Sequence, residues 1–197
     1  MGRKPLSQAK REETRQKLFE TSNRMIAEGG IENLNIRSLC KEVGISYSSF
    51  YDYYKNKDEL IASKSDAMDR FYVENEAARL RNGNFYLDLK NFILLYSEFA
   101  GSRNIEIIRE VYRMQMYSIL KRSYQKERPI RSILERIIQE GIERKELPEN
   151  INVKDTERMI LSFCKGVVID WCACDGEYSI IEFTKSAVNI LDLLNNK

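Results

Sequence analysis

The sequence contains no histidine, and its 197 residues include only three prolines and nine glycines. Without histidine, and with no cluster of carboxylates, nothing indicates a metal site or acid–base catalysis, so we expect no cofactor and no enzymatic activity. Helix-breaking residues are few and well spaced, which predicts long helices joined by short breaks. Alternation of β-branched and polar residues is nearly absent, so we expect no sheet and an all-α fold.

Cysteine is also scarce. Four thiols do not make a disulfide framework in a chain of this length, and the pair at positions 172 and 174 lacks the CxxC spacing of a structural zinc knuckle. We interpret the cysteines as small buried hydrophobic residues, with a redox or metal sensor as the alternative. They are Cys40, Cys164, Cys172 and Cys174.

Long apolar runs are missing too. Residues 1–17 contain no apolar core of a signal peptide, and no run approaches the roughly 20 residues that span a bilayer. We therefore expect a cytoplasmic protein with no membrane partner. The 1–17 segment carries six basic residues against two acidic ones, whereas the net charge of the whole chain is only +2. Such a basic arm suits contact with a polyanion, or is a solvated, frayed terminus.

The spacing of apolar residues, with capping residues and glycines at the segment ends, predicts about nine helices. Asn35 is a suitable N-cap for the second helix, Gly44 ends that helix, and Ser46 caps the third. Asn56 and Glu59 form a capping box for the fourth. Residues 35–54 therefore form a predicted helix-turn-helix motif. The predicted helices cover residues 8–28, 36–43, 46–54, 57–82, 85–100, 104–125, 129–144, 152–174 and 179–194.

The segment GISYSSFYDYYKNKDEL, residues 44–60, is rich in aromatic residues. At about 100° per residue, Tyr47, Phe50, Tyr51 and Tyr54 fall in one stripe of its helix. A core helix would account for Phe50 and Tyr54, but not for a stripe made mostly of tyrosine or for serines at the start. A DNA-reading helix accounts for both, because small hydroxyls permit close approach to bases and tyrosine hydroxyls bond phosphate oxygens.

The run NIRSLCKEVGISYSSFYDYYKNKDEL, residues 35–60, resembles the DNA-binding signature of the TetR family of bacterial repressors. The resemblance implies that Phe50 and Tyr54 pack in a small core while neighbouring side chains face DNA. One departure is Asp52, where the family often has histidine. Asp52 would accept from a cytosine amine and select sequence, or would only point at a lysine. The candidate DNA contacts, from the residue pattern and the resemblance together, are Arg37, Ser46, Tyr47, Ser48, Ser49, Tyr51, Tyr53, Lys55 and Lys57.

A DNA-binding domain of residues 1–58 leaves residues 59–197 to sense a ligand, to dimerise, or both. The last helix carries two apolar rows, and a helix lying on its own domain needs only one, so we expect the other to face a partner. Gly166 would let a partner backbone approach closely. The alternative is a monomer with a fully buried helical hairpin. The expected dimer interface comprises Phe163, Gly166, Val167, Phe183, Ala187, Ile190, Leu191 and Leu194.

Aromatic and methionine side chains of the middle helices are candidates for an effector pocket. Such residues suit an apolar or aromatic small molecule, although similar rows also form ordinary cores. The candidate ligand contacts are Phe92, Tyr96, Phe99, Met114, Met116, Tyr117, Cys164 and Trp171.

These features and the resemblance predict a homodimeric, all-helical transcriptional repressor that binds an inverted-repeat DNA operator. A small-molecule effector would shift its population from a DNA-competent to an incompetent state. A ligand-independent DNA-binding architectural protein of the same fold is the alternative. A helical enzyme is disfavoured, because no nucleophile, base and oxyanion site occur together in the sequence.

Overall fold

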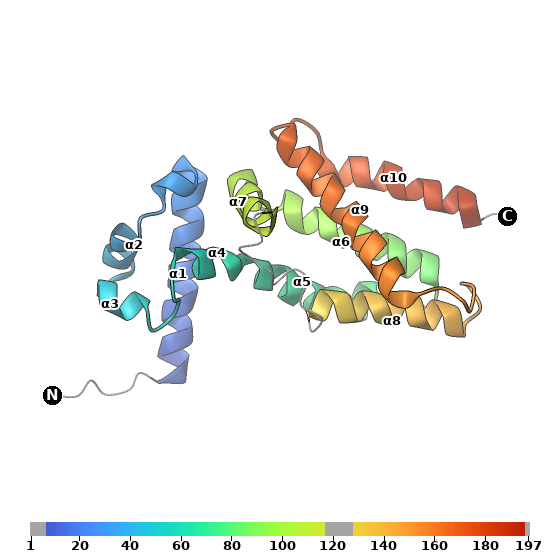
Figure 1. The fold of residues 1–197 in the computed structure, drawn as a ribbon, viewed down its shortest axis with the longest axis horizontal. Helices are drawn as coiled ribbons and strands as arrows, with labels where there is room; N and C mark the ends of the chain where they lie inside the picture. Colours follow the sequence, from blue (N-terminus) through green and yellow to red (C-terminus); the bar gives the residue numbers. More distant parts are fainter. Residues whose placement is uncertain (1–6, 117–127, 196–197) are drawn as a thin grey trace. The chain divides into compact units, whose positions relative to one another are not determined.

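The computed structural model describes residues 7–116 and 128–195, with the backbone alone at positions 65, 116 and 190–195. The described residues are helical and include no strand, so the predicted all-α fold is confirmed. The chain divides into two compact units between Lys64 and Ser65 (Figure 1). None of the described helices is both long and apolar enough to cross a membrane.

The first unit holds the predicted helix-turn-helix. Its core forms where α1 and α2 pack together and α3 packs on α2, which covers Leu18, Leu39 and Phe50 completely. Each such side chain removed from water contributes roughly 1.5–3 kcal/mol to folding. The described elements of this unit are α1 (Gln8–Gly29), the 3-10 turn η1 (Ile31–Asn33), α2 (Ile36–Val43), α3 (Tyr47–Phe50) and α4 (Lys57–Ala62).

Local capping determines where these short helices begin and end. The Asn35 side chain accepts hydrogen bonds from the first backbone N–H groups of α2, and the Ser46 hydroxyl accepts from Ser49 N at the start of α3. Gly44 ends α2 at φ 77° and ψ 32°, a left-handed conformation that glycine adopts without strain. Asn56 accepts from Glu59 N at the start of α4, which is one bond of the predicted capping box, whereas the Glu59 carboxylate accepts from Lys55 N, one residue before the N-cap.

Three expected boundaries differ from the observed ones. The third helix ends at Phe50, and residues 51–53 continue as turns closed by hydrogen bonds such as Tyr53 N to Phe50 O (2.9 Å). The helix expected over residues 57–82 is interrupted at Ser63, whose hydroxyl donates to the Leu60 carbonyl (2.7 Å). The domain boundary expected after residue 58 lies inside α4, whereas the two compact units divide between Lys64 and Ser65. Leu60 of α4 is buried, and it belongs to the first unit.

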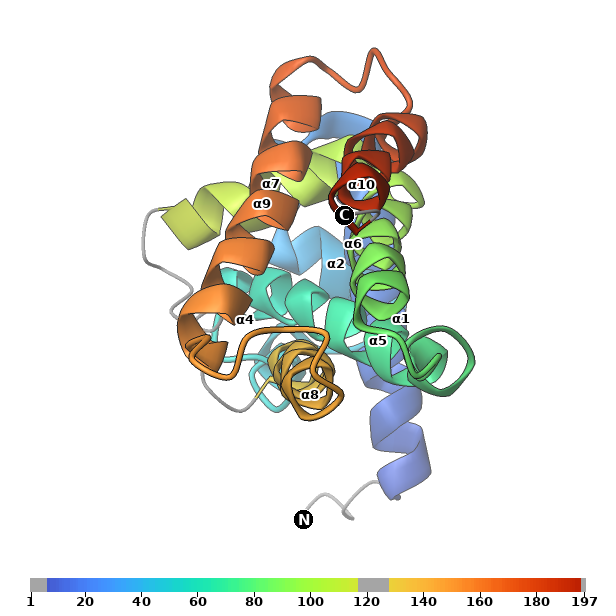
Figure 2. The ribbon, with the colours of Figure 1, turned by 90° about the vertical axis from the view of Figure 1, so that its right-hand side faces the viewer.

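The second unit is built around α6, which contacts α7, α8, α9 and α10. Figure 2 shows α9 and α10 running beside α6. Polar bonds fix the packing, since the Tyr72 hydroxyl donates to Phe92 O (2.6 Å) and Ser97 and Thr184 share a buried hydroxyl pair (2.7 Å). The helices are α5 (Lys64–Arg79), α6 (Phe85–Gly101), α7 (Ile105–Met116), α8 (Pro129–Glu143), α9 (Val153–Ala173) and α10 (Ile180–Asn195).

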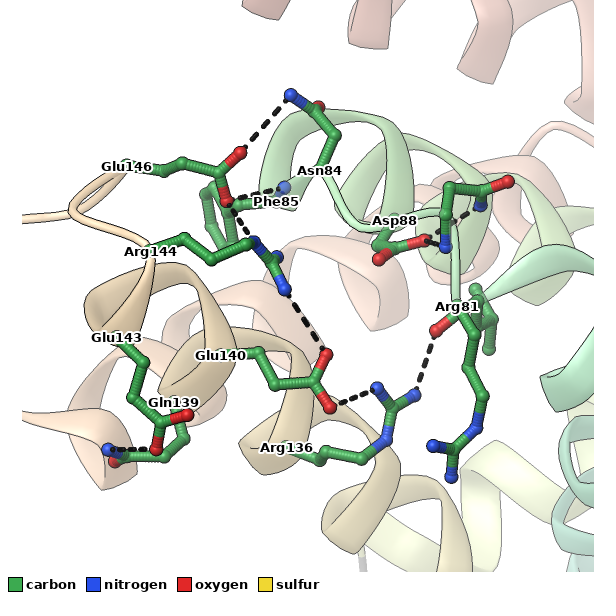
Figure 3. Close-up of polar contacts among 12 residues, drawn as sticks. Arg81, Asn84, Phe85, Asp88, Arg136, Gln139, Glu140, Glu143, Arg144 and Glu146 are labelled. Atoms are coloured by element: carbon green, nitrogen blue, oxygen red, sulfur yellow. Dashed lines mark hydrogen bonds and ion pairs between the residues drawn. The ribbon is translucent and has the colours of Figure 1, made fainter.

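A chain of charged side chains ties the end of α8 to the start of α6 (Figure 3). Glu146 accepts hydrogen bonds from Phe85 N (3.0 Å) and from Arg144 Nε (2.9 Å), so a carboxylate from outside the helix caps α6. Arg144 also reaches Glu140, which accepts from Arg136, and Arg136 in turn donates to the carbonyl oxygen of Leu80 (2.8 Å). The connection between α5 and α6 is thereby held against α8.

Candidate functional site

The outward face of the helix-turn-helix carries two exposed tyrosines, Tyr47 and Tyr51, which we call the tyrosine pair. Arg37 lies beside them. Tyr47 and Tyr51 are 46% and 49% exposed. Their rings meet edge to face at 5.4 Å, and the Tyr51 hydroxyl donates to the Tyr47 hydroxyl (2.8 Å). This hydrogen bond raises the pKa of Tyr51. Arg37 from α2 lies over the Tyr47 ring at 5.6 Å, so three predicted DNA contacts form one cluster.

The three serines at the start of α3 separate into two kinds. Ser46 and Ser48 are exposed, with 2.9 Å between their hydroxyl oxygens. Ser49 is only 7% exposed, and its hydroxyl lies 2.7 Å from that of Ser46. The Ser49 side chain is therefore packed within the motif beside the N-cap, unlike the Ser46 and Ser48 side chains, and its contact with DNA stays a prediction.

The two lysines predicted to contact DNA, Lys55 and Lys57, differ in exposure. Lys55 is exposed beyond the end of the tyrosine segment, whereas Lys57 is half-buried. Lys57 Nζ donates to the carbonyl oxygen of Ile31 (2.9 Å), which joins α4 to the turn that follows α1. Tyr53 is half-buried as well. Of these residues, Lys55 is the one presented most openly to a polyanion.

Two arginines of the basic arm contact the end of residues 47–54, which we call the recognition segment, and the sequence did not predict these contacts. Arg11 donates to the backbone carbonyl of Asp52 (2.8 Å) and lies 5.9 Å from the centre of the Tyr53 ring. Arg15 lies 5.4 Å from the centre of the Tyr54 ring. The sequence shows that the arm is basic. It does not show that these arginines lie against the tyrosine rings, because the contacting residues are about forty positions apart in the chain.

The described candidate ligand contacts are all buried in the second unit. Phe92 is fully covered, and Phe99 packs on Phe71 with ring centres 5.5 Å apart. Trp171 donates its indole N–H to Tyr178 O (3.1 Å). Tyr117 and the side chain of Met116 lie outside the described residues. Each described candidate has less than a tenth of its surface exposed; these are Phe92, Tyr96, Phe99, Met114, Cys164 and Trp171.

Polar groups are buried among these apolar side chains. The hydroxyls of Tyr96 and Tyr112 lie 2.9 Å apart, and burial raises the pKa of both phenols. Arg131 pairs with the fully buried Glu157 at 2.8 Å, yet Glu157 Oε1 has no hydrogen-bond partner among the described residues. Burial lowers the pKa of Lys165, and the nearby Arg128 and Arg131 lower it further.

The expected dimer residues also separate by exposure. Phe163 on α9 and Phe183 on α10 are 44% and 48% exposed. Gly166, which is also on α9, is exposed as well. A Cβ added to Gly166 would meet no atom within 4 Å. Val167 is buried at 8% exposure, so in this chain it is a core residue. Ala187 is half-buried, and the side chains of Ile190, Leu191 and Leu194 lie outside the described residues.

All four cysteines are free thiols. Cys40, Cys164 and Cys172 are buried, as the interpretation of them as small hydrophobic residues expects, whereas Cys174 is exposed. Burial raises the pKa of Cys164 to about 12 and that of Cys172 to about 11, which keeps both protonated. In the part of the chain that the structure describes, no three His, Cys, Asp or Glu side chains are placed to hold a metal ion.

A short helix, a left-handed glycine turn and a second short helix with outward tyrosines define a helix-turn-helix DNA-binding protein. Residues 18–63 match the family described as "Bacterial regulatory proteins, tetR family", and residues 102–194 match "YsiA-like protein, C-terminal region". The chain belongs to the TetR family of bacterial transcription regulators, as the resemblance of its DNA-binding segment implied.

Two named relatives match most of the chain. The fatty acid metabolism regulator protein of Bacillus subtilis (strain 168) is 23% identical over 181 residues, which cover 88% of this chain and 91% of that protein. The HTH-type transcriptional regulator UidR of Escherichia coli (strain K12) is 25% identical over 171 residues, which cover 83% of this chain and 84% of that protein. By name, the first is a regulator of fatty acid metabolism and the second is a regulator of transcription.

Solved structures share the same fold. FadR from Bacillus halodurans has a TM-score of 0.70 at 17% identity and covers 96% of both chains. FadR from Bacillus subtilis, crystallised in complex with stearoyl-CoA, has a TM-score of 0.67 at 18% identity, with 89% of this chain and 96% of that chain covered. At these identities the likeness establishes the arrangement of helices.

Proposed function

We propose that this TetR-family regulator binds an inverted-repeat operator as a homodimer in the cytoplasm and that a small-molecule effector releases it. The observation that carries the DNA-binding part is the exposed tyrosine pair with Arg37 on the helix-turn-helix. Tyrosine hydroxyls bond phosphates and their rings pack on thymine methyls, while arginine is suited to guanine edges. These groups form one outward surface on α2, α3 and the turn that follows α3.

Base reading at this surface is tested by substitution. A duplex selected by the wild-type protein from a randomised pool provides the probe, and single-base variants of it report specificity. Arg37→Ala should cost roughly 1–3 kcal/mol of binding at one base position per half-site and should relax selectivity there. An even loss of affinity across all duplex variants would make Arg37 a positioning residue instead.

Dimerisation is supported by apolar side chains left in solvent on α9. Met159 is 65% exposed, and Phe163 and Ile169 are 44% and 41% exposed on the same helix. Exposed apolar groups concentrated on one helix favour association, and a two-fold arrangement of two chains matches an inverted repeat. Phe183 on α10 extends the apolar surface that we assign to the interface.

Effector binding is proposed for the second unit, where apolar and aromatic residues surround buried polar groups. The relative from Bacillus subtilis crystallised with stearoyl-CoA suggests an apolar chain joined to a polar head. Phe92 and Phe99 suit the apolar part, and Glu157 Oε1, which has no hydrogen-bond partner among the described residues, is available to a donor on the polar part or to water.

The effector part is tested by titrating the complex of protein and selected duplex with stearoyl-CoA, stearate and free coenzyme A. Release of DNA by stearoyl-CoA, with a raised melting temperature of the free protein, is the expected result. Absence of both effects for all three compounds and for a panel of other hydrophobic compounds would favour the alternative, a DNA-binding protein of the same fold that responds to no ligand.

A further inference from the structure

Lys64, the first residue of α5, has its side chain buried in the first unit. Only 5% of the residue is exposed. Its Nζ donates to the Ser22 hydroxyl (2.9 Å) and to the Asn23 side-chain oxygen (2.6 Å), both on α1, and lies 4.6 Å from the centre of the Phe19 ring. A buried lysine is rare unless a carboxylate pairs with it, and all three contacts here are neutral.

The hydrogen bonds around Lys64 form a continuous chain. Ser22 is fully buried and donates its own hydrogen to the Phe19 carbonyl (2.8 Å), so its oxygen is free to accept from the lysine. An ammonium and a neutral amine can each donate the two bonds to Ser22 and Asn23. The contacts therefore survive a change of protonation state, whereas the cost of keeping the group out of water depends on its charge.

Charged side chains on α1 and α4, the elements next to Lys64, have hydrogen-bond or ion-pair partners other than Lys64. On α1, Glu20 accepts from Gln16 and Arg24 pairs with Glu28 and Glu42. On α4, Glu59 accepts from Lys55 N, and on α5 the nearest carboxylate in the chain is Asp66. Burial alone lowers the pKa of Lys64 to about 7, with no charged neighbour contributing.

The position of Lys64 gives this contact a consequence for DNA binding. The division between the two units falls immediately after it, and α5 continues from it into the second unit. Lys64 is thus the point at which the connecting helix is fastened to α1, whose Arg11 holds the end of the recognition segment.

The geometry points to Lys64 as a proton-linked positioning residue, which anchors the connecting helix to α1 and makes operator affinity weaken on acidification toward neutral pH. This inference rests on the proposed operator binding. When the anchor opens, the amine becomes hydrated and regains its ordinary pKa of 10.5. Between about 7 and 10.5 the open state binds a proton that the anchored state does not, so each pH unit of acidification favours opening by up to about tenfold. Below about pH 7 the effect levels off.

The direct test is an NMR titration of the lysine side chains of the full chain. One lysine resonance should titrate near pH 7 and should be missing from Lys64→Met. Lys165→Met provides a second assignment, because Lys165 is half-buried and, among the described residues, is the other lysine with a lowered pKa. If Lys64→Met does not fold, a resonance that titrates near pH 7 and persists in Lys165→Met identifies Lys64. Titration of Lys64 near 10.5 would overturn the inference.

The functional test measures affinity for the duplex selected by the wild-type protein between pH 7 and pH 9. The ratio of wild-type to Lys64→Met affinity should rise several-fold over this range, because a methionine side chain at this position cannot release a proton on anchoring. Lys10→Met removes an exposed lysine of α1 and should change affinity by the same factor at every pH. A constant ratio for Lys64→Met would also overturn the inference. Failure to select any duplex would contradict the proposed function, and the NMR titration would still decide the state of Lys64.

Discussion

Lys57 and Lys55 lie two positions apart, yet their surroundings give them different expected effects on binding and stability. Lys57→Ala removes the hydrogen bond to the Ile31 carbonyl and should lower the free energy of unfolding by roughly 0.5–1.5 kcal/mol. Lys55→Ala removes an exposed charge and should leave stability unchanged. In DNA binding, Lys55→Ala should reduce the slope of log affinity against log salt by about one unit, and Lys57→Ala should leave that slope nearly unchanged.

Urea unfolding and binding at several salt concentrations check both variants. If Lys57→Ala alters the salt dependence as much as Lys55→Ala does and leaves the unfolding free energy unchanged, Lys57 is a phosphate contact and its bond to Ile31 is incidental.

At the scale of helices, the pattern of caps and apolar residues predicted most of the fold. Asn35, Gly44, Ser46 and Asn56 mark helix ends that the structure places at the same positions, because a cap depends on side chains only a few residues away. The break at Ser63 was not predicted, since helical pattern and propensity continue across it.

The candidate DNA surface was predicted less completely, because exposure depends on tertiary contacts. Ser49 and Ser48 are neighbours of the same type, and only the packing of α3 turns one inward and leaves the other outward. Arg11 and Lys64 belong to contacts that join positions about forty residues apart, for which the sequence carries no local signal.

Close packing of α8 on α6 leaves no room for a larger side chain at Gly141. An added Cβ would lie 2.9 Å from Phe85 Cδ2 and 3.1 Å from Phe85 Cβ. Gly141→Ala should therefore lower the free energy of unfolding by roughly 1–3 kcal/mol through overpacking, despite the better helix propensity of alanine.

A double-mutant cycle separates the two contributions. In a Phe85→Ala background the ring atoms are absent and only the Phe85 Cβ contact at 3.1 Å remains, so Gly141→Ala should cost clearly less than in the wild-type background. Equal losses in both backgrounds, measured by urea unfolding, would show that the contact with Phe85 is not what makes glycine necessary.

At the scale of the whole molecule, a substitution at Gly166 tests the association of two chains without disturbing the folding of one. Its open surroundings accommodate a leucine within the subunit, so Gly166→Leu should leave the unit folded while it pushes a partner helix away. The protein should then shift toward monomer in sedimentation and lose affinity for an inverted repeat.

Two exposed apolar residues provide a matched comparison for the interface. Phe163 on α9 and Leu87 on α6 are 44% and 45% exposed. Phe163→Ser should weaken dimerisation, whereas Leu87→Ser should not. Equal effects of the two substitutions, or none from Gly166→Leu, would place the interface elsewhere.

The account depends most on the claim that two chains together read one inverted repeat. Sedimentation of the wild-type protein with its selected duplex, at micromolar concentration, measures the number of chains on each DNA molecule. We predict two chains per inverted repeat and a large loss of affinity when one half-site is scrambled. One chain bound tightly per duplex, or equal affinity for the intact and scrambled repeats, would contradict the account.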